Sequence, residues 1–223
     1  SWLEGDQWDS IMNYDAFMEP VTWFLTGMEK HSDSYNGGIW GDGEAFFNAM
    51  GYHMSRMQTN TVMTAMNQLS NHDHSRFLTR TNQMVGRIQT AGPEKAGQNI
   101  KPCVFREAVV IQMTWPGAPT LYYGDEAGVC GWTDPDSRRT YPWGKEDLEL
   151  IEFHRYMTGI HRKIPAFRKG AVKPLLAGYQ KIAYGRMYGK YQAVVVISNS
   201  PDSRTMDIPV WQLGVTDDMV LGR

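Results

Sequence analysis

Hydrophobic positions recur with helical spacing in several stretches of the chain. Such spacing predicts amphipathic helices over residues 44–57 and 150–164. The first of these stripes, for which we expect core packing, contains Phe47, Met50, Met54 and Met57. Residues 104–113 are apolar nearly all round, which favours a buried helix. Pro20 suits the first turn of a further helix over residues 21–27.

Short apolar runs alternate with these helices. Residues 11–14, 62–69 and 119–123 are brief enough to be buried strands. Strands that alternate with helices predict a parallel sheet with crossover helices, and hence the α/β fold class. Residues 80–102, by contrast, are polar and contain glycine, so we expect a long surface excursion there.

The hydrophobic period changes after about Gly170. Residues 181–188 alternate and residues 191–198 have an apolar centre, which predicts two antiparallel strands. The Gly189-Lys190 pair between them suits a two-residue hairpin turn with glycine first. A β region is therefore expected to follow the strand–helix alternation.

The composition of the chain indicates a globular protein and bears on its partners and its cysteines. The chain has 223 residues, 42% of them hydrophobic, and a formal net charge of −2. This balance is typical of a globular protein and argues against nucleic acid or a membrane surface as partner. No apolar run approaches the roughly 20 residues of a spanning helix. Cys103 and Cys130 are the two cysteines. Because two cysteines do not make a disulfide scaffold, we expect free thiols and a cytoplasmic location.

Polar side chains follow the run 62–69. His72, Asp73, His74 and Arg76 arrive within five positions. The carboxyl ends of parallel strands are where such folds place their sites. Three interpretations of the residues stay open. Asp73 stabilises a developing cation while His72 holds a polar substrate, or His72, Asp73 and His74 bind a metal, or the cluster is a satisfied polar cap.

A second group of charges follows the run 119–123. It lies in one predicted loop and consists of Asp134, Asp136, Arg138 and Arg139. Alternating acids and arginines form charge-assisted networks that shape pocket walls. They are equally compatible with a surface salt-bridge cluster of little energetic value.

Four blocks together resemble the α-amylase family of glycoside hydrolases. They are GDQWDSIMNYDAF at residues 5–17, SNHDHSRFL at 70–78, PGAPTLYYGDEAG at 116–128 and DPDSRRTYPW at 134–143. The blocks occur in the family's order and at sensible spacing. The last one resembles the neopullulanase and cyclomaltodextrinase-like branch. The resemblance covers roughly residues 1–200.

The resemblance implies a fold and a division of the chain. The family has a (β/α)8 TIM barrel and then an antiparallel β domain, and residues 11–14, 64–70 and 119–123 would be strands six to eight. Residues 1–168 would be the carboxyl-side part of the barrel, and residues 169–223 the start of the β domain, truncated. Open strand edges in such a piece predict self-association, or cover by the missing barrel half.

The resemblance also implies roles for single residues. Asp73 matches the carboxylate that stabilises the oxocarbenium-like transition state, and His72 matches the histidine that binds hydroxyls of the sugar at the cleavage point. Asp134 and Arg138 match by spacing an acid and an arginine that line the sugar site. Two tryptophans near that loop are candidates for stacking on sugar faces, although packing is the commoner role: Trp132 and Trp143.

A nucleophile and an acid/base complete the chemistry of retaining glycosidases. In the family they follow strands four and five, and nothing in this sequence matches either motif; Glu4 is the nearest candidate for the acid and lies outside the matching position. We therefore expect part of a retaining glycoside hydrolase acting on α-glucosidic bonds of maltodextrin or starch-type glucans, inactive alone. A non-catalytic α-glucan-binding or remnant protein is the alternative. We expect no cofactor and no metal, calcium included.

Overall fold

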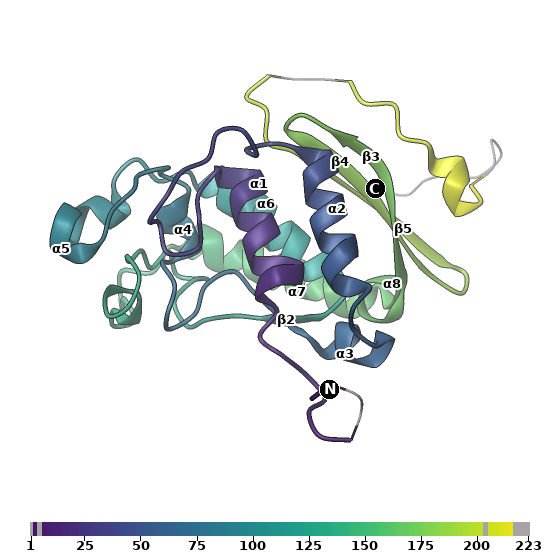
Figure 1. Cartoon of the computed structure of the whole chain (residues 1–223), viewed down its shortest axis with the longest axis horizontal. Coiled ribbons are helices and arrows are strands. Elements are labelled where there is room, and N and C mark those ends of the chain that lie inside the picture. Colours follow the sequence, from purple (N-terminus) through teal and green to yellow (C-terminus); the bar gives the residue numbers. More distant parts are fainter. Residues whose placement is uncertain (1, 4–5, 203–204, 216–223) are drawn as a thin grey trace.

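The structure of the protein is a computed structural model that describes residues 2–3, 6–202 and 205–215. Glu4 and residues 216–223 of the predicted β domain lie outside the described residues. Helices packed around short strands form one part of the molecule, and a three-stranded sheet lies beside them (Figure 1). Among the described residues, no helix combines the length and apolar character that a membrane crossing requires.

Short parallel segments lie at the centre. β1 (Met66–Gln68) and β2 (Ala118–Thr120) form a parallel pair in which Met66 faces Ala118. Met12 forms a parallel bridge to Met66. The parallel pairing predicted from the alternation of strands and helices is therefore present in this part of the chain.

Asn67 ties these segments together from within the sheet. Asn13 Nδ2 donates to Asn67 Oδ1 at 2.8 Å, and Asn67 Nδ2 donates to the Pro116 carbonyl at 3.0 Å. Gln112 Nε2 donates to the Asn67 carbonyl at 2.9 Å. Asn13 and Asn67 are buried, where polar groups are stabilised by partners within the protein; Asn13 Oδ1 accepts no bond from the described residues. The centre is consequently held by side chains as well as by main-chain pairing.

The strand predicted over residues 11–14 is not formed as a continuous element. Only Met12 pairs, and the chain turns at once into a π-helical turn, Tyr14–Met18. This turn carries Phe17 and Met18 into the core, where both are fully buried, and burial of such side chains outweighs continued strand pairing.

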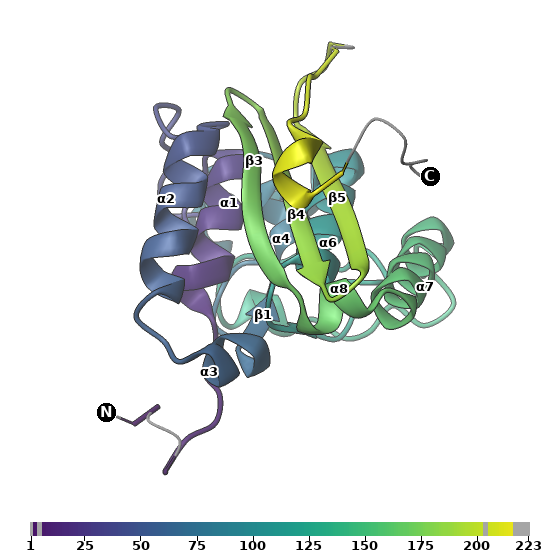
Figure 2. The same ribbon diagram turned by 90° about the vertical axis from the view of Figure 1, so that its right-hand side faces the viewer.

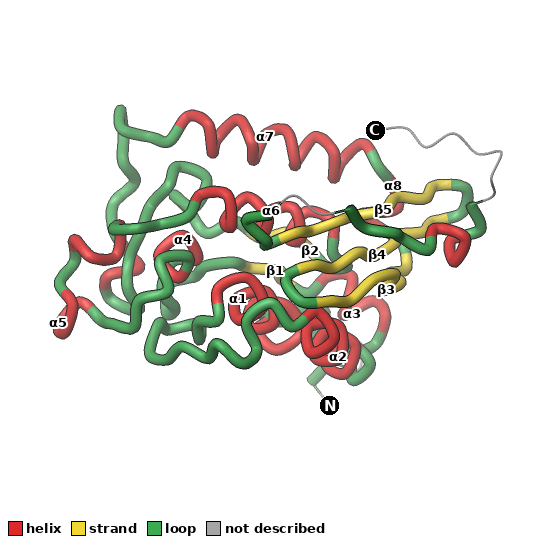
Figure 3. The backbone as a smooth tube through the Cα atoms, turned by 90° about the horizontal axis from the view of Figure 1, so that it is seen from above, coloured by secondary structure: helices red, strands yellow, loops and turns green. Residues whose placement is uncertain are grey.

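The helices are distributed between the parallel segments. Those between Met12 and β1 are α1 (Glu19–Thr26), α2 (Gly43–Met54) and α3 (Thr59–Thr64). Those between β1 and β2 are α4 (Phe77–Arg80), α5 (Ile88–Ala91) and α6 (Pro102–Thr114). After β2 come α7 (Leu148–Lys163) and α8 (Pro165–Lys169). α2 and α7 lie at opposite edges of the molecule, with α1 and α6 between them (Figures 2 and 3).

Capping side chains set the starts of the two amphipathic helices. Asp42 Oδ1 accepts from the Ala45 N–H at 2.9 Å before α2, and Asp147 Oδ1 accepts from the Leu150 N–H at 3.0 Å before α7. Such caps satisfy main-chain donors that the helix leaves unpaired. The predicted helices over residues 44–57 and 150–164 are confirmed with shifts of up to three residues at their ends.

Residues 80–102 are only partly the surface excursion expected from their polarity. Arg80 and Ala96 are fully buried, and Thr81 is 1% exposed. Ala96 packs into the main hydrophobic core. The start and the middle of residues 80–102 are therefore packed into the protein, which their polar composition did not predict.

The second part is an antiparallel sheet in the order β3–β4–β5. Its strands are β3 (Ala171–Gly178), β4 (Lys181–Tyr188) and β5 (Tyr191–Ser198). The two predicted strands and their hairpin are confirmed, with Gly189 at a φ of +56° in the turn. The sheet covers the helices on one side of the molecule (Figure 2). Tyr184 of the central strand reaches the Trp115 ring, 5.0 Å between centroids, so both parts share one core.

Candidate functional site

The segment that follows β1 turns sharply at Asn71. Its Oδ1 accepts from the N–H groups of Asp73 and His74, both at 2.9 Å. Side-chain bonds of this kind stabilise a tight turn. Asn71 Nδ2 also donates to the Tyr14 hydroxyl oxygen at 3.0 Å. Asn71 is buried while the next two residues, His72 and Asp73, are exposed. The turn therefore presents both side chains to solvent.

His72, Asp73, Asp134 and Arg138 lie together, and we call this group the Asp73 cluster. His72 Nε2 is 3.3 Å and Arg138 Nη2 is 3.8 Å from Asp73 Oδ1. Arg138 Nε donates to Asp134 Oδ1 at 2.5 Å. Each side chain is about half exposed, from 48% to 53%. The four residues matched from sequence therefore meet, with one guanidinium between two carboxylates that solvent reaches.

Hydrogen bonds to the main-chain carbonyls of His72 and Asp73 fasten the loop after β2 to the Asp73 segment. The Asp73 carbonyl accepts from the Asp134 N–H at 3.1 Å and from Thr133 Oγ1 at 2.5 Å. Ser137 Oγ donates to the His72 carbonyl at 2.9 Å. None of these bonds involves a side chain of the Asp73 cluster, so they hold its two halves together independently of the four side chains that form it.

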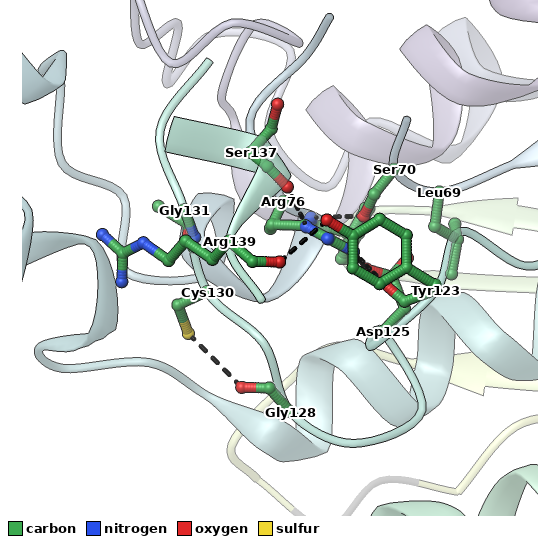
Figure 4. A network of polar contacts seen from close by, with 12 residues as sticks. Leu69, Ser70, Arg76, Tyr123, Asp125, Gly128, Cys130, Gly131, Ser137 and Arg139 are labelled. Atoms are coloured by element: carbon green, nitrogen blue, oxygen red, sulfur yellow. Dashed lines mark hydrogen bonds and ion pairs between the residues drawn. The ribbon is translucent and has the colours of Figure 1, made fainter. Parts of the chain in front are cut away.

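Arg76 links the same segments through a buried network of polar contacts (Figure 4). Its guanidinium donates to the carbonyls of Ser137 and Tyr123 at 2.9 and 2.7 Å and to Asp125 Oδ1 at 2.9 Å. It also lies 4.1 Å from the centroid of the Tyr122 ring, a cation–π contact. Both ionic partners are buried. Burial raises the pKa of the Asp125 carboxyl, and the neighbouring Arg76 opposes that shift.

Arg80 is the second buried arginine next to the turn. It donates to the Leu69 carbonyl at 2.5 Å, to the Ser75 carbonyl at 2.7 Å and to Thr22 Oγ1 at 2.5 Å. Burial lowers the pKa of its guanidinium to about 10, so the group stays charged at neutral pH. It joins α1, the end of β1 and α4 through neutral acceptors.

His74 faces the interior, away from the Asp73 cluster. Its ring lies edge-on to Tyr14 and His31, with centroid distances of 4.8 and 4.6 Å. Burial, with a smaller contribution from Arg80, lowers its pKa to about 3. The described residues hold no group of three or more His, Cys, Asp or Glu side chains able to bind a metal. His74 is therefore a packed neutral residue.

The second acid–arginine pair of the loop has a structural role. Asp136 is buried, accepts from the Trp132 N–H at 2.8 Å and pairs with Arg139 through both carboxylate oxygens. Trp132 is fully buried, which agrees with the packing role that was considered the commoner one and leaves no ring face for a sugar. Trp143 is 81% exposed and lies 4.4 Å from the Tyr141 ring.

Sequence reasoning missed two residues beside the site. Tyr14 contacts Asn71, and both burial and the nearby Asp73 raise the pKa of its phenol. His31 Nδ1 lies 2.7 Å from Thr133 Oγ1, the hydroxyl that binds the Asp73 carbonyl. Tyr14 stands at the end of a short apolar run, a position that could have marked it. His31 lies in a loop without any such signal.

Comparison with known proteins identifies relatives along most of the chain. The family described as "Alpha amylase, catalytic domain" matches residues 1–169. Neopullulanase 2 of Thermoactinomyces vulgaris is 32% identical over 217 residues, which cover 96% of this chain and 32% of that protein. An amylopullulanase of Thermoanaerobacter thermohydrosulfuricus is 30% identical over 228 residues, which cover 92% of this chain and 14% of that protein.

Solved structures agree with these sequence matches. The native form of the Nostoc punctiforme debranching enzyme superimposes with a TM-score of 0.78 at 27% identity, over 99% of this chain and 43% of that one. A cyclomaltodextrinase superimposes with a TM-score of 0.67 at 28% identity, over 87% of this chain and 29% of that one. The chain thus spans less than half the length of each of these four relatives.

Proposed function

The chain belongs to the α-amylase family, and from this membership we propose that it is part of a retaining glycoside hydrolase for α-glucosidic bonds in maltodextrin or starch-type glucans. Its relatives include proteins named neopullulanase, amylopullulanase and cyclomaltodextrinase. The observation that carries the proposal is the Asp73 cluster, which joins the carboxyl end of β1 to the loop after β2. That end of a parallel barrel is where TIM-barrel enzymes have their active sites.

We assign a role to each member of the Asp73 cluster. The exposed Asp73 carboxylate stabilises the positive charge that develops on the sugar in an oxocarbenium-like transition state. His72 exchanges hydrogen bonds with sugar hydroxyls. Arg138 holds Asp73 and Asp134 at the rim, where Asp134 accepts from hydroxyls of the next sugar ring.

We further propose that the segments around Met12, β1 and β2 are barrel strands six to eight, within residues 1–168, and that residues 169–223 begin a β domain. The parallel pairing and the start of the antiparallel sheet at Ala171 support this division. Because no part of the printed sequence matches the family's nucleophile or acid/base motif, the chain alone does not turn over glucan. Hydrolysis of soluble starch by this chain at an ordinary enzymatic rate would refute that inference.

The role of Asp73 is tested by comparing two ligands in calorimetry. Asp73→Asn removes the charge and keeps the shape, so a cationic amino-sugar mimic of the transition state should bind at least roughly tenfold more weakly. Neutral maltotriose should lose less, because it carries no charge for Asp73 to meet. Asp207→Asn, at an exposed carboxyl outside the site, is the matched control and should change neither.

The alternative is a non-catalytic α-glucan-binding protein. In that case Asp73→Asn leaves both ligands equally bound, or weakens both by the same factor. Either result would show that the carboxylate does not distinguish charged from neutral sugars, and would remove the argument for a transition-state role.

A further inference from the structure

A cavity of about 320 Å³ lies at the junction of α1, the start of α6 and the end of β5. Leu25 and Val104 give it apolar walls, and Trp40 lines it as the aromatic residue. The cavity shares no residue with the Asp73 cluster. Its volume is at the lower end of the roughly 300–1,000 Å³ of small-molecule sites, which are mostly apolar with a few placed polar groups.

Hydrogen bonds from distant parts of the chain fix the walls. The Leu25 carbonyl accepts from Trp40 Nε1 at 3.1 Å and from Asn199 Nδ2 at 2.7 Å. The main-chain N–H of Gln180 donates to the Gly41 carbonyl at 2.6 Å. The cavity is therefore preformed, and a ligand would not have to order it on binding.

Glu107 is the polar group of this cavity that lacks a partner. Its Oε2 is buried and accepts no hydrogen bond from any residue that the structure describes. Burial raises the pKa of this carboxyl to about 8, so the neutral form predominates at pH 7. A buried oxygen without a partner is unfavourable. Glu107 lines the cavity, and its neutral carboxyl can both donate to and accept from a ligand hydroxyl.

The charge at the cavity disfavours a cationic ligand. Lys101 lines the cavity directly before the start of α6, and its Nζ donates to Gln83 Oε1 at 2.9 Å. With Glu107 neutral at pH 7, the charged side chain is Lys101, which repels a cation. Hydroxyl groups can bond to both side chains without a net charge.

We propose that this cavity binds one or two rings of a neutral sugar, with apolar ring faces against Trp40, Leu25 and Val104 and hydroxyls toward Glu107 and the amides of Gln180 and Asn199. The existence of this second site does not depend on the proposed function. Only the identification of the sugar as a glucose unit of an α-glucan rests on it.

Cys103 provides a reporter within the chain. Its thiol is exposed and lines the cavity, whereas Cys130 is buried, and burial raises the pKa of the Cys130 thiol to about 11. Alkylation by iodoacetamide, followed by mass spectrometry, should therefore report Cys103 alone. Saturating maltose should slow that reaction at least about fivefold, because reagents attack thiols that solvent reaches.

Variants separate this site from the Asp73 cluster. Glu107→Leu should weaken protection of Cys103 by maltose about tenfold, since one hydrogen bond is lost, whereas Glu107→Gln keeps a donor and should nearly preserve it. Trp40→Ala should also weaken it. Asp73→Asn should leave protection unchanged. If only the proposed function is wrong, the calorimetric comparison of the amino-sugar with maltotriose should fail while maltose still protects Cys103.

Three results would overturn the inference. The first is an unchanged rate of Cys103 alkylation at the highest soluble concentration of maltose. The second is protection by glucosamine or glucuronate but not by neutral sugars. The third is loss of protection in Asp73→Asn, which would place the bound sugar at the Asp73 cluster.

Discussion

Two buried arginines, Arg76 and Arg80, bind main-chain carbonyls next to the Asp73 turn. The carbonyls bound by Arg80 flank the turn, and those bound by Arg76 lie in the segment after β2. Arg76 also has a carboxylate partner, Asp125, whereas Arg80 bonds carbonyl and hydroxyl oxygens. A buried charge is tolerated when its hydrogen bonds are complete and becomes costly when one partner is removed. The effect of a substitution here therefore depends on the group that is left behind.

Arg76→Met should destabilise the protein by about 3–5 kcal/mol in urea unfolding, because Asp125 would stay buried without its ionic partner. Arg155→Met is the matched control, since its partner Glu152 is exposed, and should cost no more than about 1 kcal/mol. The double variant Arg76→Met with Asp125→Leu should recover much of the loss. Equal losses in the two single variants would contradict the prediction.

His74 should make stability depend on pH between about 6.5 and 3. The folded protein lowers the imidazole pKa to about 3 by burial, so below its usual pKa of about 6.5 the unfolded chain takes up the proton first. Stability should then fall as pH falls, with a slope of up to about 1.4 kcal/mol per pH unit from this group. His74→Gln should flatten the slope by that amount in urea titrations at several pH values; identical slopes would refute it.

At the scale of single residues, the sequence did not predict the burial of a charged residue within a polar stretch. Arg80 sits in a polar, glycine-containing segment and has the composition of a surface residue, yet it is fully buried. Its acceptors, such as the Leu69 carbonyl and the Thr22 hydroxyl, carry no signature in a sequence. Asp73 and Arg138, by contrast, were each matched to the sugar site of the family through motifs in the family's order, and their side chains lie 3.8 Å apart.

The elements divide into those specified locally and those specified by their neighbours. α7 begins at a capping aspartate and carries an apolar stripe, and β4 with β5 alternates around a two-residue turn, so a short window of sequence predicts each. β3 was missed because it contains Pro174 and lacks clear alternation; its pairing shifts register between Pro174 and Leu176. Proline in an edge strand is tolerated since one side needs no ladder bond.

The start of α7 offers a test at this scale. Asp147→Ala removes the bond to the Leu150 N–H and should lower the free energy of unfolding by about 1 kcal/mol. Asp147→Ser keeps an acceptor and should lose less. Chemical denaturation followed by helix circular dichroism measures both; an alanine variant as stable as the serine variant would show that the cap contributes nothing.

The whole molecule combines a short parallel centre with an antiparallel sheet on a shared core. Among the described residues, β1 lies between β2 and the segment around Met12 and pairs with both. In this part of the chain, the outer edges of β2 and of the Met12 segment pair with no further strand. The fold neighbours are TIM-barrel enzymes of the α-amylase family. An open edge with unpaired main-chain groups attracts another strand.

The chain should therefore self-associate through the segment of residues 11–13. Sedimentation velocity over a range of concentrations should show species larger than the monomer, and Ile11→Lys should shift the equilibrium toward monomer, because a lysine on an edge opposes pairing. Trp143→Lys removes an exposed apolar side chain outside this edge and should have no such effect. A well-folded monomer at every concentration would defeat the prediction.

The bonds of Asn67 also bear on the order in which the chain folds. Two of them join residues that are separated in sequence by 54 and by 49 positions, whereas the β4–β5 hairpin closes through a turn of two residues. Contacts distant in sequence are made slowly, and local ones quickly. The hairpin and the helices should thus be in place while the parallel centre is still open. The two halves of the Asp73 cluster meet only across that centre, so we expect the cluster to be among the last features of the molecule to be assembled.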